Sequence, residues 1–343
     1  MSTVTGTPGA APKYTKKDFE SDQDVRWCPG CGDYAILSAM QKTMPGLGIP
    51  KEDIVFISGI GCSSRFPYYM NTYGFHTIHG RAPALATGLK LARPELKVFV
   101  ITGDGDGLSI GGNHLLHVLR RNVDVTILLF NNKIYGLTKG QYSPTSELGK
   151  VTKSTPMGSA DRPLSPCVFA LAAGATFVAR TVDRNIAHME ETLRRASAHK
   201  GAAFVEILQN CNVYNDLAWN VLYDKDSKAL YECRLEHGKP ITFGPADDRR
   251  GLVLEGLKPK VVKVKDVATS ALWVHDATDR ATAMLLAQLW VPAYPVSVGV
   301  LLNLEGETTY EEIVIQQEQK AISERGAGDV GKLLVSGETW KIG

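Results

Sequence analysis

One stretch, residues 98–132, limits the fold of this chain more than any other. It reads as strand, glycine-rich turn, helix and strand: residues 98–102, Gly103-Asp104-Gly105, residues 113–121 and residues 124–130, with Asn131-Asn132 at the end. In an open α/β sheet, ligands bind outside the carboxyl ends of the strands. We therefore expect the polar groups that follow the two strands to lie at one edge of a sheet.

These polar groups suit a cation and a phosphate. Asp104 can meet a divalent cation directly, and Asn132, with a backbone carbonyl just beyond it, can complete the protein part of the shell. A hard cation such as Mg2+ takes few protein oxygens and shares phosphate oxygens. The glycines at positions 103, 105 and 107 let the backbone approach a diphosphate, whose charge the following helix N-terminus favours. The stretch predicts a site for Mg2+ and a diphosphate.

The glycine-rich turn has three other interpretations. A dinucleotide-binding fingerprint would need a third glycine where Ile110 stands. An EF-hand loop starting at Asp104 would need a bidentate glutamate where Leu115 stands. An ordinary glycine-rich connection between a strand and a helix remains possible from the triplet alone.

Cys28 and Cys31 form a CxxC motif on a tight turn, where two thiolates can face one metal centre. Taken alone, the motif is at least as typical of a zinc knuckle. A knuckle needs a second pair, however, and the sequence has no second CxxC. The motif therefore indicates a metal site whose other ligands are single cysteines.

Four single cysteines remain as candidates for those ligands. We favour Cys62 and Cys211, because each follows a predicted strand, residues 54–58 and residues 204–208, on the edge where Gly103 lies. Cys167 and Cys233 are expected to be buried or incidental thiols.

The whole sequence of 343 residues, with a net charge of +2 and no basic run interleaved with aromatic residues, gives no reason to expect a nucleic-acid partner. Residues 1–17 lack the apolar core of a secretory signal and are expected to be a disordered tail. Residues 283–304 are apolar enough to raise the question of a membrane span, but two prolines and a glutamine favour a buried helix (277–289), a turn and a strand (296–302). We expect a soluble, cytoplasmic protein without a membrane partner.

The remaining pattern is an alternation of strands and helices. It predicts an α/β fold with a mostly parallel sheet and helices on both faces. We assign residues 18–216 to this domain. Residues 217–343 are expected to be a C-terminal extension with a helix over 310–325 and no evident chemistry.

In order along the chain, six motifs resemble those of the β subunits of 2-oxoacid:ferredoxin oxidoreductases, which have a thiamine-diphosphate-binding fold. The motifs are Cys28-x-x-Cys31-Gly32, Gly61-Cys62-Ser63-Ser64, His79-Gly80-Arg81, Gly103-Asp104-Gly105, Asn131-Asn132 and Cys211. The resemblance extends over about residues 25–216, and the motifs are specific as a set although each is weak alone.

The resemblance implies a set of site residues. The ligands of one [4Fe-4S] cluster would be Cys28, Cys31, Cys62 and Cys211, and those of Mg2+ would be the side chains of Asp104 and Asn132 with the carbonyl of Ile134. The contacts of thiamine diphosphate would be Ile60, Gly61, Cys62, Ser63, His79, Gly80, Arg81, Asp104, Gly105, Asp106, Gly136 and Leu137. The candidate catalytic residues are Lys139, His79 and Arg81, of which Lys139 matches a position that contacts the 2-oxoacid. The Lys139-Gly140-Gln141 sequence looks like that of enzymes accepting 2-oxoglutarate.

The activity implied is oxidative decarboxylation of a 2-oxoacid to an acyl-coenzyme A and CO2, reversible in principle, with electrons passing singly through the cluster to ferredoxin. In the family, the glutamate that activates thiamine diphosphate lies in a separate pyrimidine-binding domain. The chain would therefore need an α subunit, in an α2β2 assembly.

Two alternatives stay open from the sequence. One is a non-redox thiamine diphosphate decarboxylase component with a structural zinc at Cys28 and Cys31. The other is a non-catalytic partner protein that binds a Mg2+ nucleotide through residues 103–107.

Overall fold

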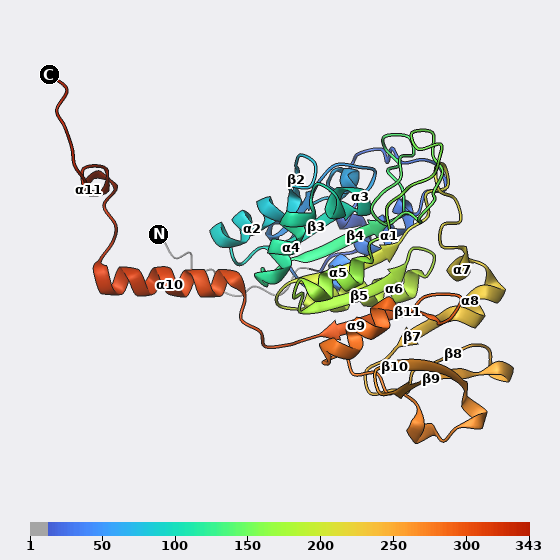
Figure 1. Cartoon of the computed structure of the whole chain (residues 1–343). Coiled ribbons are helices and arrows are strands. Elements are labelled where there is room, and N and C mark those ends of the chain that lie inside the picture. Colours follow the sequence, from blue (N-terminus) through green and yellow to red (C-terminus); the bar gives the residue numbers. More distant parts are fainter. Residues whose placement is uncertain (1–12) are drawn as a thin grey trace.

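The computed structural model describes residues 13–343 and contains a central eight-stranded sheet in the order β2-β1-β3-β4-β6-β5-β11-β7 (Figure 1). Its strands are β1 (Ile54–Ser58), β2 (Tyr73–His76), β3 (Lys97–Gly103), β4 (Thr126–Asn131), β5 (Phe177–Val182), β6 (Ala203–Leu208), β7 (Glu232–Leu235) and β11 (Val296–Asn303). All pairs from β2 to β5 are parallel, β11 runs antiparallel to β5, and β7 is parallel to β11. The predicted mostly parallel sheet is confirmed.

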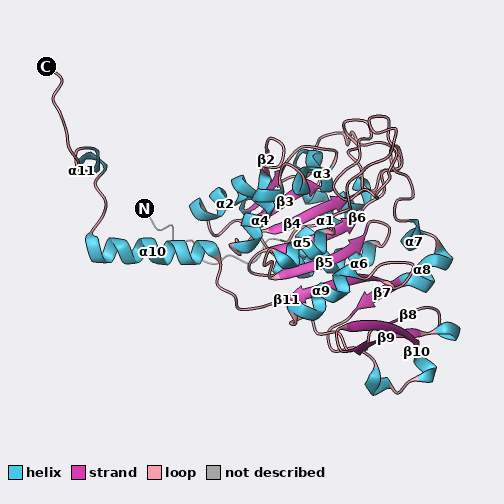
Figure 2. Ribbon diagram, in the orientation of Figure 1, coloured by secondary structure: helices cyan, strands magenta, loops and turns pink. Residues whose placement is uncertain are grey.

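Helices cover both faces of this sheet, as predicted (Figure 2). One face carries α2 (Ala82–Ala92), α4 (Gly112–Arg120), α5 (Pro166–Ala172) and α9 (Arg280–Gln288). The other face carries α1 (Asp33–Thr43) and α6 (Ile186–Ala198). Every residue of β4 and β6 is buried, as expected of parallel strands between two helical layers.

The glycine-rich segment differs in detail from the predicted turn. β3 continues to Gly103, and a short helix, α3 (Asp104–Leu108), begins at the next residue. The strand expected over 124–130 starts later, at Thr126. A tight turn in which Val125 N donates to the Val123 carbonyl (2.8 Å) precedes it, and Asp124 uses its side chain to bind Lys90 and the Gly201 N–H.

Residues 217–343, expected to be an extension, contribute β7 and β11 to the central sheet. The other elements of this part are α7 (Asn220–Tyr223), α8 (Lys225–Tyr231), a three-stranded sheet of β8 (Thr242–Phe243), β9 (Arg250–Glu255) and β10 (Lys258–Lys263), α10 (Tyr310–Arg325) and α11 (Val330–Leu334). α10 has the predicted bounds and extends away from the body of the molecule (Figure 1).

The expected tail, residues 1–17, lies for the most part outside the described residues. Its described end is folded: Tyr14 packs edge to face on Phe19 with ring centroids 5.3 Å apart, and Lys16–Phe19 form a 3-10 helix. Phe19 is fully buried and anchors this segment, so the expected disorder does not extend over residues 13–17.

Residues 283–304 form the end of α9, a turn and β11, much as predicted. Among the described helices, none combines the length and the apolar character that crossing a membrane requires.

Candidate active site

The carboxyl ends of four neighbouring parallel strands form one edge of the sheet, next to the green loops in Figure 1. β1 leads into residues 59–63, β3 into Asp104, β4 into Asn132 and β6 into residues 209–211. Segments far apart in the sequence thereby meet where an open α/β sheet binds its ligands.

Asp104 is 2% exposed and opens α3. Its Oδ2 accepts hydrogen bonds from the hydroxyls of Ser143 and Thr145, which belong to the long loop after β4. No side chain among residues 13–343 donates a hydrogen bond to its Oδ1. Burial raises the pKa of Asp104 to about 6, and the two hydroxyl donors oppose that shift. A cation at Oδ1 would favour the ionised carboxylate, so the geometry fits a Mg2+ ligand.

Asp104, Asn132 and Ile134 line one cavity at this edge of the sheet, which we call the small cavity. The Asn132 Oδ1 accepts a hydrogen bond from Ile134 N (3.1 Å), and the Asn132 carbonyl accepts one from Asn215 Nδ2 (2.9 Å). These bonds fix the turn after β4. The side-chain oxygen of Asn132 and the carboxylate of Asp104 therefore reach this cavity from neighbouring strand ends.

Asp106 connects three segments around the cavity. Its Oδ1 accepts the N–H groups of Ile60 (3.1 Å) and Gly80 (2.8 Å), and His79 Nδ1 lies 2.6 Å from the same oxygen. Its Oδ2 accepts the hydroxyl of Thr102 (2.7 Å). Both oxygens are thus used within the protein. Asp106 shapes the cavity by holding the loop after β1, the loop before α2 and the end of β3 together.

The cavity has a volume of about 50 Å³ and fits the diphosphate end of a coenzyme. The Ser63 hydroxyl is buried beside Gly103 and has no partner in the described part of the chain, so it is free to donate to a phosphate. At Gly105, a Cβ would lie 2.2 Å from the Tyr135 ring, whose hydroxyl donates to the Gly105 carbonyl (2.9 Å). The lining residues include Asp33, Ile60, Gly61, Cys62, Ser63, His79, Asp104, Gly105, Asp106, Asn132, Ile134, Tyr135, Gly136 and Leu137.

Four cysteines, Cys28, Cys31, Cys62 and Cys211, line a second cavity of about 210 Å³. It shares lining residues with the first, among them Gly136. A Cβ at Gly136 would lie 3.5 Å from the Sγ atoms of both Cys62 and Cys211. Because glycine has no side chain, only the backbone of Gly136 lies between the two cavities. Cys167 and Cys233 are fully buried elsewhere, as predicted.

Burial dominates the electrostatics of this cysteine cavity. It raises the pKa of Cys62 to about 12 and that of Cys31 further, with Asp33 adding to both shifts. Gln209 Nε2 donates to Cys31 Sγ (3.3 Å). Thiolates in this place need a cationic partner, and the donor set is the one that holds zinc or an iron-sulfur cluster.

The other residues suggested by the sequence differ in their exposure and in whether they line a cavity. His79 lines the small cavity, and Gly80 N–H is used by Asp106. Arg81 is exposed at the start of α2 and lines neither cavity. Lys139 is exposed, has φ +74°, and lines the cysteine cavity together with Arg26 and Arg65.

Sequence reasoning missed four residues of this site. Asp33 is 2% exposed and lines both cavities, and Tyr135 covers Gly105. Ser143 and Thr145 bind Asp104 across about forty residues of sequence. Asp33 could have been found from the sequence, because a carboxylate two residues after the CxxC motif stands at the start of a predicted helix. The two hydroxyl residues could not, because serine and threonine are ordinary loop residues.

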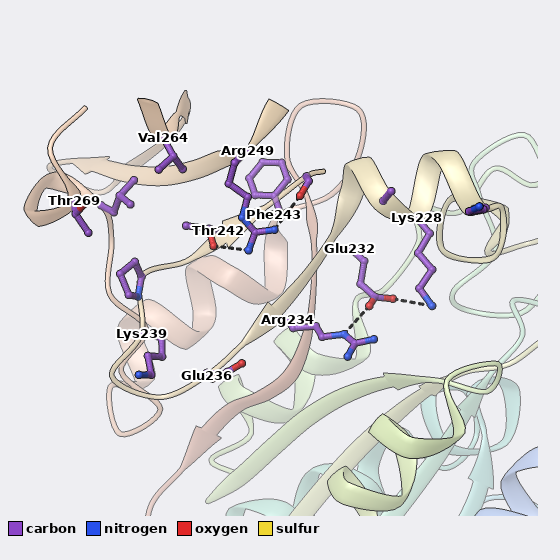
Figure 3. A pocket seen from close by; sticks show the side chains of 15 residues that line it. Lys228, Glu232, Arg234, Glu236, Lys239, Thr242, Phe243, Arg249, Val264 and Thr269 are labelled. Atoms are coloured by element: carbon purple, nitrogen blue, oxygen red, sulfur yellow. Dashed lines mark hydrogen bonds and ion pairs between the residues drawn. The ribbon is translucent and has the colours of Figure 1, made fainter. Parts of the chain in front are cut away.

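A larger cavity lies elsewhere. It has about 810 Å³ and lies between α8, β7 and the three-stranded sheet (Figure 3). Charged side chains surround it, including Lys228, Arg234, Lys239, Arg249 and Glu232. None of the residues suggested by the sequence lines it.

Comparisons with known proteins agree with this geometry. Residues 59–207 match the family described as thiamine pyrophosphate enzyme, C-terminal TPP binding domain. The chain is 52% identical over 341 residues to the 2-oxoglutarate oxidoreductase subunit KorB of Mycobacterium tuberculosis, with 98% of this chain and 91% of the relative covered. It is 48% identical over 223 residues to the β subunit of 2-oxoacid:ferredoxin oxidoreductase 1 of Aeropyrum pernix, covering 65% and 69% of the two chains.

A solved structure is similar over nearly the whole length. It is the 2-oxoglutarate:ferredoxin oxidoreductase from Magnetococcus marinus with 2-oxoglutarate, coenzyme A and succinyl-CoA bound. The TM-score is 0.75 at 33% identity, and the match covers 95% of this chain and 97% of that one.

Proposed function

The chain belongs to the β subunits of 2-oxoacid:ferredoxin oxidoreductases, and on that premise we propose that it acts on 2-oxoglutarate with thiamine diphosphate, Mg2+ and a [4Fe-4S] cluster. The reaction is the coenzyme A-dependent oxidative decarboxylation to succinyl-CoA and CO2, with ferredoxin as electron acceptor. One observation carries the proposal: a cavity lined by four cysteines adjoins a cavity with a buried, preset carboxylate, and the two share Gly136.

In the proposed function, the small cavity binds Mg2+ and the diphosphate of the coenzyme. Asp104 and Asn132 would supply side-chain oxygens to the cation, Ile134 its carbonyl, and Ser63 a hydroxyl donor to phosphate. When bound, thiamine diphosphate supplies the carbanion that adds to the 2-oxo carbon and stabilises the product of CO2 loss. The residues of this chain hold the coenzyme and fix its orientation.

The cysteine cavity would hold the cluster, a one-electron carrier. Within residues 13–343, no three histidine, cysteine, aspartate or glutamate side chains are close enough to hold a single metal ion. Four cysteines line the cavity, and the sequence has one CxxC pair and two single cysteines there in place of the second pair that a zinc knuckle needs. This donor set supports the cluster over the structural zinc of the alternative function.

Two features support the need for an α subunit. The small cavity, of about 50 Å³, does not enclose a whole coenzyme, and its lining in the described chain includes no glutamate that could polarise an aminopyrimidine. Two large apolar side chains at the cavities are exposed: Leu137 (54%), which lines both, and Val213 (54%), which lines the cysteine cavity. Exposed apolar surface of this kind marks protein interfaces. We propose an α2β2 assembly in which the α subunit covers this edge.

Lys139 is the residue proposed to select 2-oxoglutarate. Its backbone N–H donates to the Gly136 carbonyl (3.0 Å), so the turn that carries it starts at the glycine between the two cavities. A lysine there gives a cation for the second carboxylate of the substrate, which pyruvate lacks.

The test is an iron, sulfide and zinc analysis of the chain purified anaerobically with its α subunit. About four irons and four sulfides per chain are expected after subtraction of any iron on the partner, with a broad visible absorbance that falls on addition of 2-oxoglutarate and coenzyme A. Zinc in a colourless sample would instead favour the non-redox decarboxylase.

Cys211→Ser sharpens this test. The variant should lose the cluster and ferredoxin reduction while still binding thiamine diphosphate, because Asp104 and Asn132 are unchanged. Cys233→Ala is the matched control, since this thiol is buried in β7 and away from both cavities. Full electron transfer in Cys211→Ser would remove Cys211 from the ligand set.

A further inference from the structure

A row of buried polar side chains crosses the sheet behind the metal site. All of its members are 3% exposed or less. They come from β5, β6, β4, the loop after β4 and the start of α3: Arg180, Glu206, Asn131, Thr145 and Asp104. The neighbouring positions of these strands are largely apolar. Burying polar groups is costly unless they are paired, so the row calls for an explanation beyond packing.

The row ends at the carboxylate of Asp104. Thr145 and Ser143, which is 1% exposed, place their hydroxyls on the same oxygen, Oδ2. Charge-assisted hydrogen bonds of this kind are the stronger ones in proteins. Two of them on one oxygen fix the rotation of the carboxylate. The other oxygen, Oδ1, takes no side-chain hydrogen bond from the described residues, and Asp104 lines the cavity.

Thr145 is itself fixed from behind by Asn131. The Thr145 hydroxyl lies 2.9 Å from Asn131 Oδ1, so its proton is shared between two acceptors. Asn131 Nδ2 donates to Glu206 Oε1 (2.7 Å). An ionised carboxylate only accepts hydrogen bonds, so the amide must turn its nitrogen to Glu206 and its oxygen to Thr145. Glu206, together with the Lys133 N–H that donates to Asn131 Oδ1 (3.3 Å), therefore determines which atom of Asn131 meets Thr145.

Glu206 is held in the sheet by Arg180, directly opposite it on β5. Arg180 Nε donates to Glu206 Oε2 (2.7 Å), and Cys167 Sγ lies 3.1 Å from the same oxygen. The desolvation cost of a buried ion pair can exceed its Coulomb gain, and apolar residues of similar volume are often as stable. Stability alone is therefore a poor reason for this pair.

We propose that Ser143 and Thr145 are positioning residues for the divalent cation, which present Asp104 Oδ1 to it, and that Arg180, Glu206 and Asn131 anchor Thr145. The inference rests on the proposed function, because it takes Asp104 as a ligand of Mg2+. Ser143 and Thr145 belong to the loop that also carries Leu137 and Lys139. Cation binding and the ordering of this loop over the two cavities are therefore coupled.

The first test compares two changes at one position. Thr145→Val keeps the branched shape and removes the hydroxyl, whereas Thr145→Ser keeps the hydroxyl. In the complex with the α subunit, stripped of metal, Mg2+ is titrated at fixed thiamine diphosphate in a calorimeter. Thr145→Val should bind Mg2+ about 10- to 100-fold more weakly, as outer-shell changes at metal sites do. Thr145→Ser should stay within about threefold of wild type. Thr152→Val is the control, because its hydroxyl faces Ser154 in the same loop (3.2 Å) and not Asp104.

Kinetics separate positioning from a general structural effect. At saturating Mg2+, Thr145→Val should regain the wild-type kcat, with an unchanged KM for 2-oxoglutarate. If instead kcat stays low at saturating Mg2+ while Mg2+ affinity is unchanged, Thr145 acts on folding and the inference fails.

The second test examines the anchor with two double variants that leave no buried charge unpaired. Arg180→Met with Glu206→Gln keeps an acceptor for Asn131 Nδ2 and should retain most of the Mg2+ affinity. Arg180→Met with Glu206→Met removes the acceptor and should bind Mg2+ several-fold more weakly. Equal affinities in the two would overturn the role of Glu206.

The metal site and the positioning role of Thr145 can be disproved separately. A wild-type complex that binds thiamine diphosphate without any requirement for a divalent cation would remove the proposed metal site itself. A wild-type complex that requires Mg2+, with Thr145→Val binding it equally well, would remove only the positioning role.

Discussion

The small cavity at Asp104 and the large cavity of the C-terminal part hold their charges in opposite ways. At Asp104, one carboxylate that is 2% exposed has one oxygen occupied by two hydroxyls and the other left to the cavity. In the large cavity, the Glu232 carboxylate is shared by Arg234 (2.8 Å) and Lys228 (3.5 Å), and Arg249 binds the Gly244 carbonyl and the Thr242 hydroxyl (Figure 3).

This difference shows why volume does not identify the site. In the cavity of about 810 Å³, Glu232 is paired with Arg234 and Lys228, and Lys225 and Lys239 are exposed to water. The cavity of about 50 Å³ is lined by the Asp104 carboxylate, which is 2% exposed, and by the Ser63 hydroxyl, which is buried and has no partner in the described part of the molecule. A buried polar group whose position is fixed in advance interacts more strongly with a charged ligand than an exposed group does.

Replacing the preset carboxylate should have the largest effect. Asp104→Asn keeps the shape but loses the charge, so Mg2+ with thiamine diphosphate should bind more weakly by over about 100-fold, beyond the range of outer-shell changes. Calorimetry on the complex with the α subunit measures this loss. Asp247→Asn, at an exposed position of a 3-10 helix, is the control. Comparable weakening in both variants would contradict the metal site.

An intermediate effect is expected at the rim of the cysteine cavity. Lys139→Ala removes a cation for the second carboxylate, so the KM for 2-oxoglutarate should rise about tenfold, the weight of a hydrogen bond to a charged group. The KM for pyruvate should change little. Steady-state ferredoxin reduction with both substrates measures the difference, and Lys153→Ala, exposed in the same loop, is the control. Equal losses on both substrates would argue against the selection of 2-oxoglutarate by Lys139.

The smallest effect is expected in the large cavity. Lys225→Gln and Lys239→Gln remove cations that line it and that have no ion pair with any residue from 13 to 343. Surface changes away from special features stay within about 0.5 kcal/mol in stability. We expect ferredoxin reduction within about twofold of wild type. A tenfold loss in either variant would mean that this cavity takes part in the reaction.

Much of the fold followed from periodicity. β6 lies within one residue of its predicted bounds, and α10 has the predicted bounds, because these segments are long and regular in their apolar pattern. The predicted start of β4 is two residues too early, because Asp124 precedes an apolar run but its side chain binds Lys90 and the Gly201 N–H. Hydrogen bonds of this kind depend on residues that are distant in the sequence, so they produce no local sequence pattern.

The sequence by itself determined the kinds of chemistry available: a strand that ends in Gly103-Asp104-Gly105, a strand that ends in Asn131-Asn132, and cysteines at the ends of others. These are properties of neighbouring residues, which periodicity and spacing report. Only the tertiary structure decided that Gly136 lies between Cys62 and Cys211, that β7 and β11 join the central sheet, and that Thr145 meets Asp104. The order of strands in a sheet and the path of a long loop are set by packing between distant segments, which no local pattern encodes.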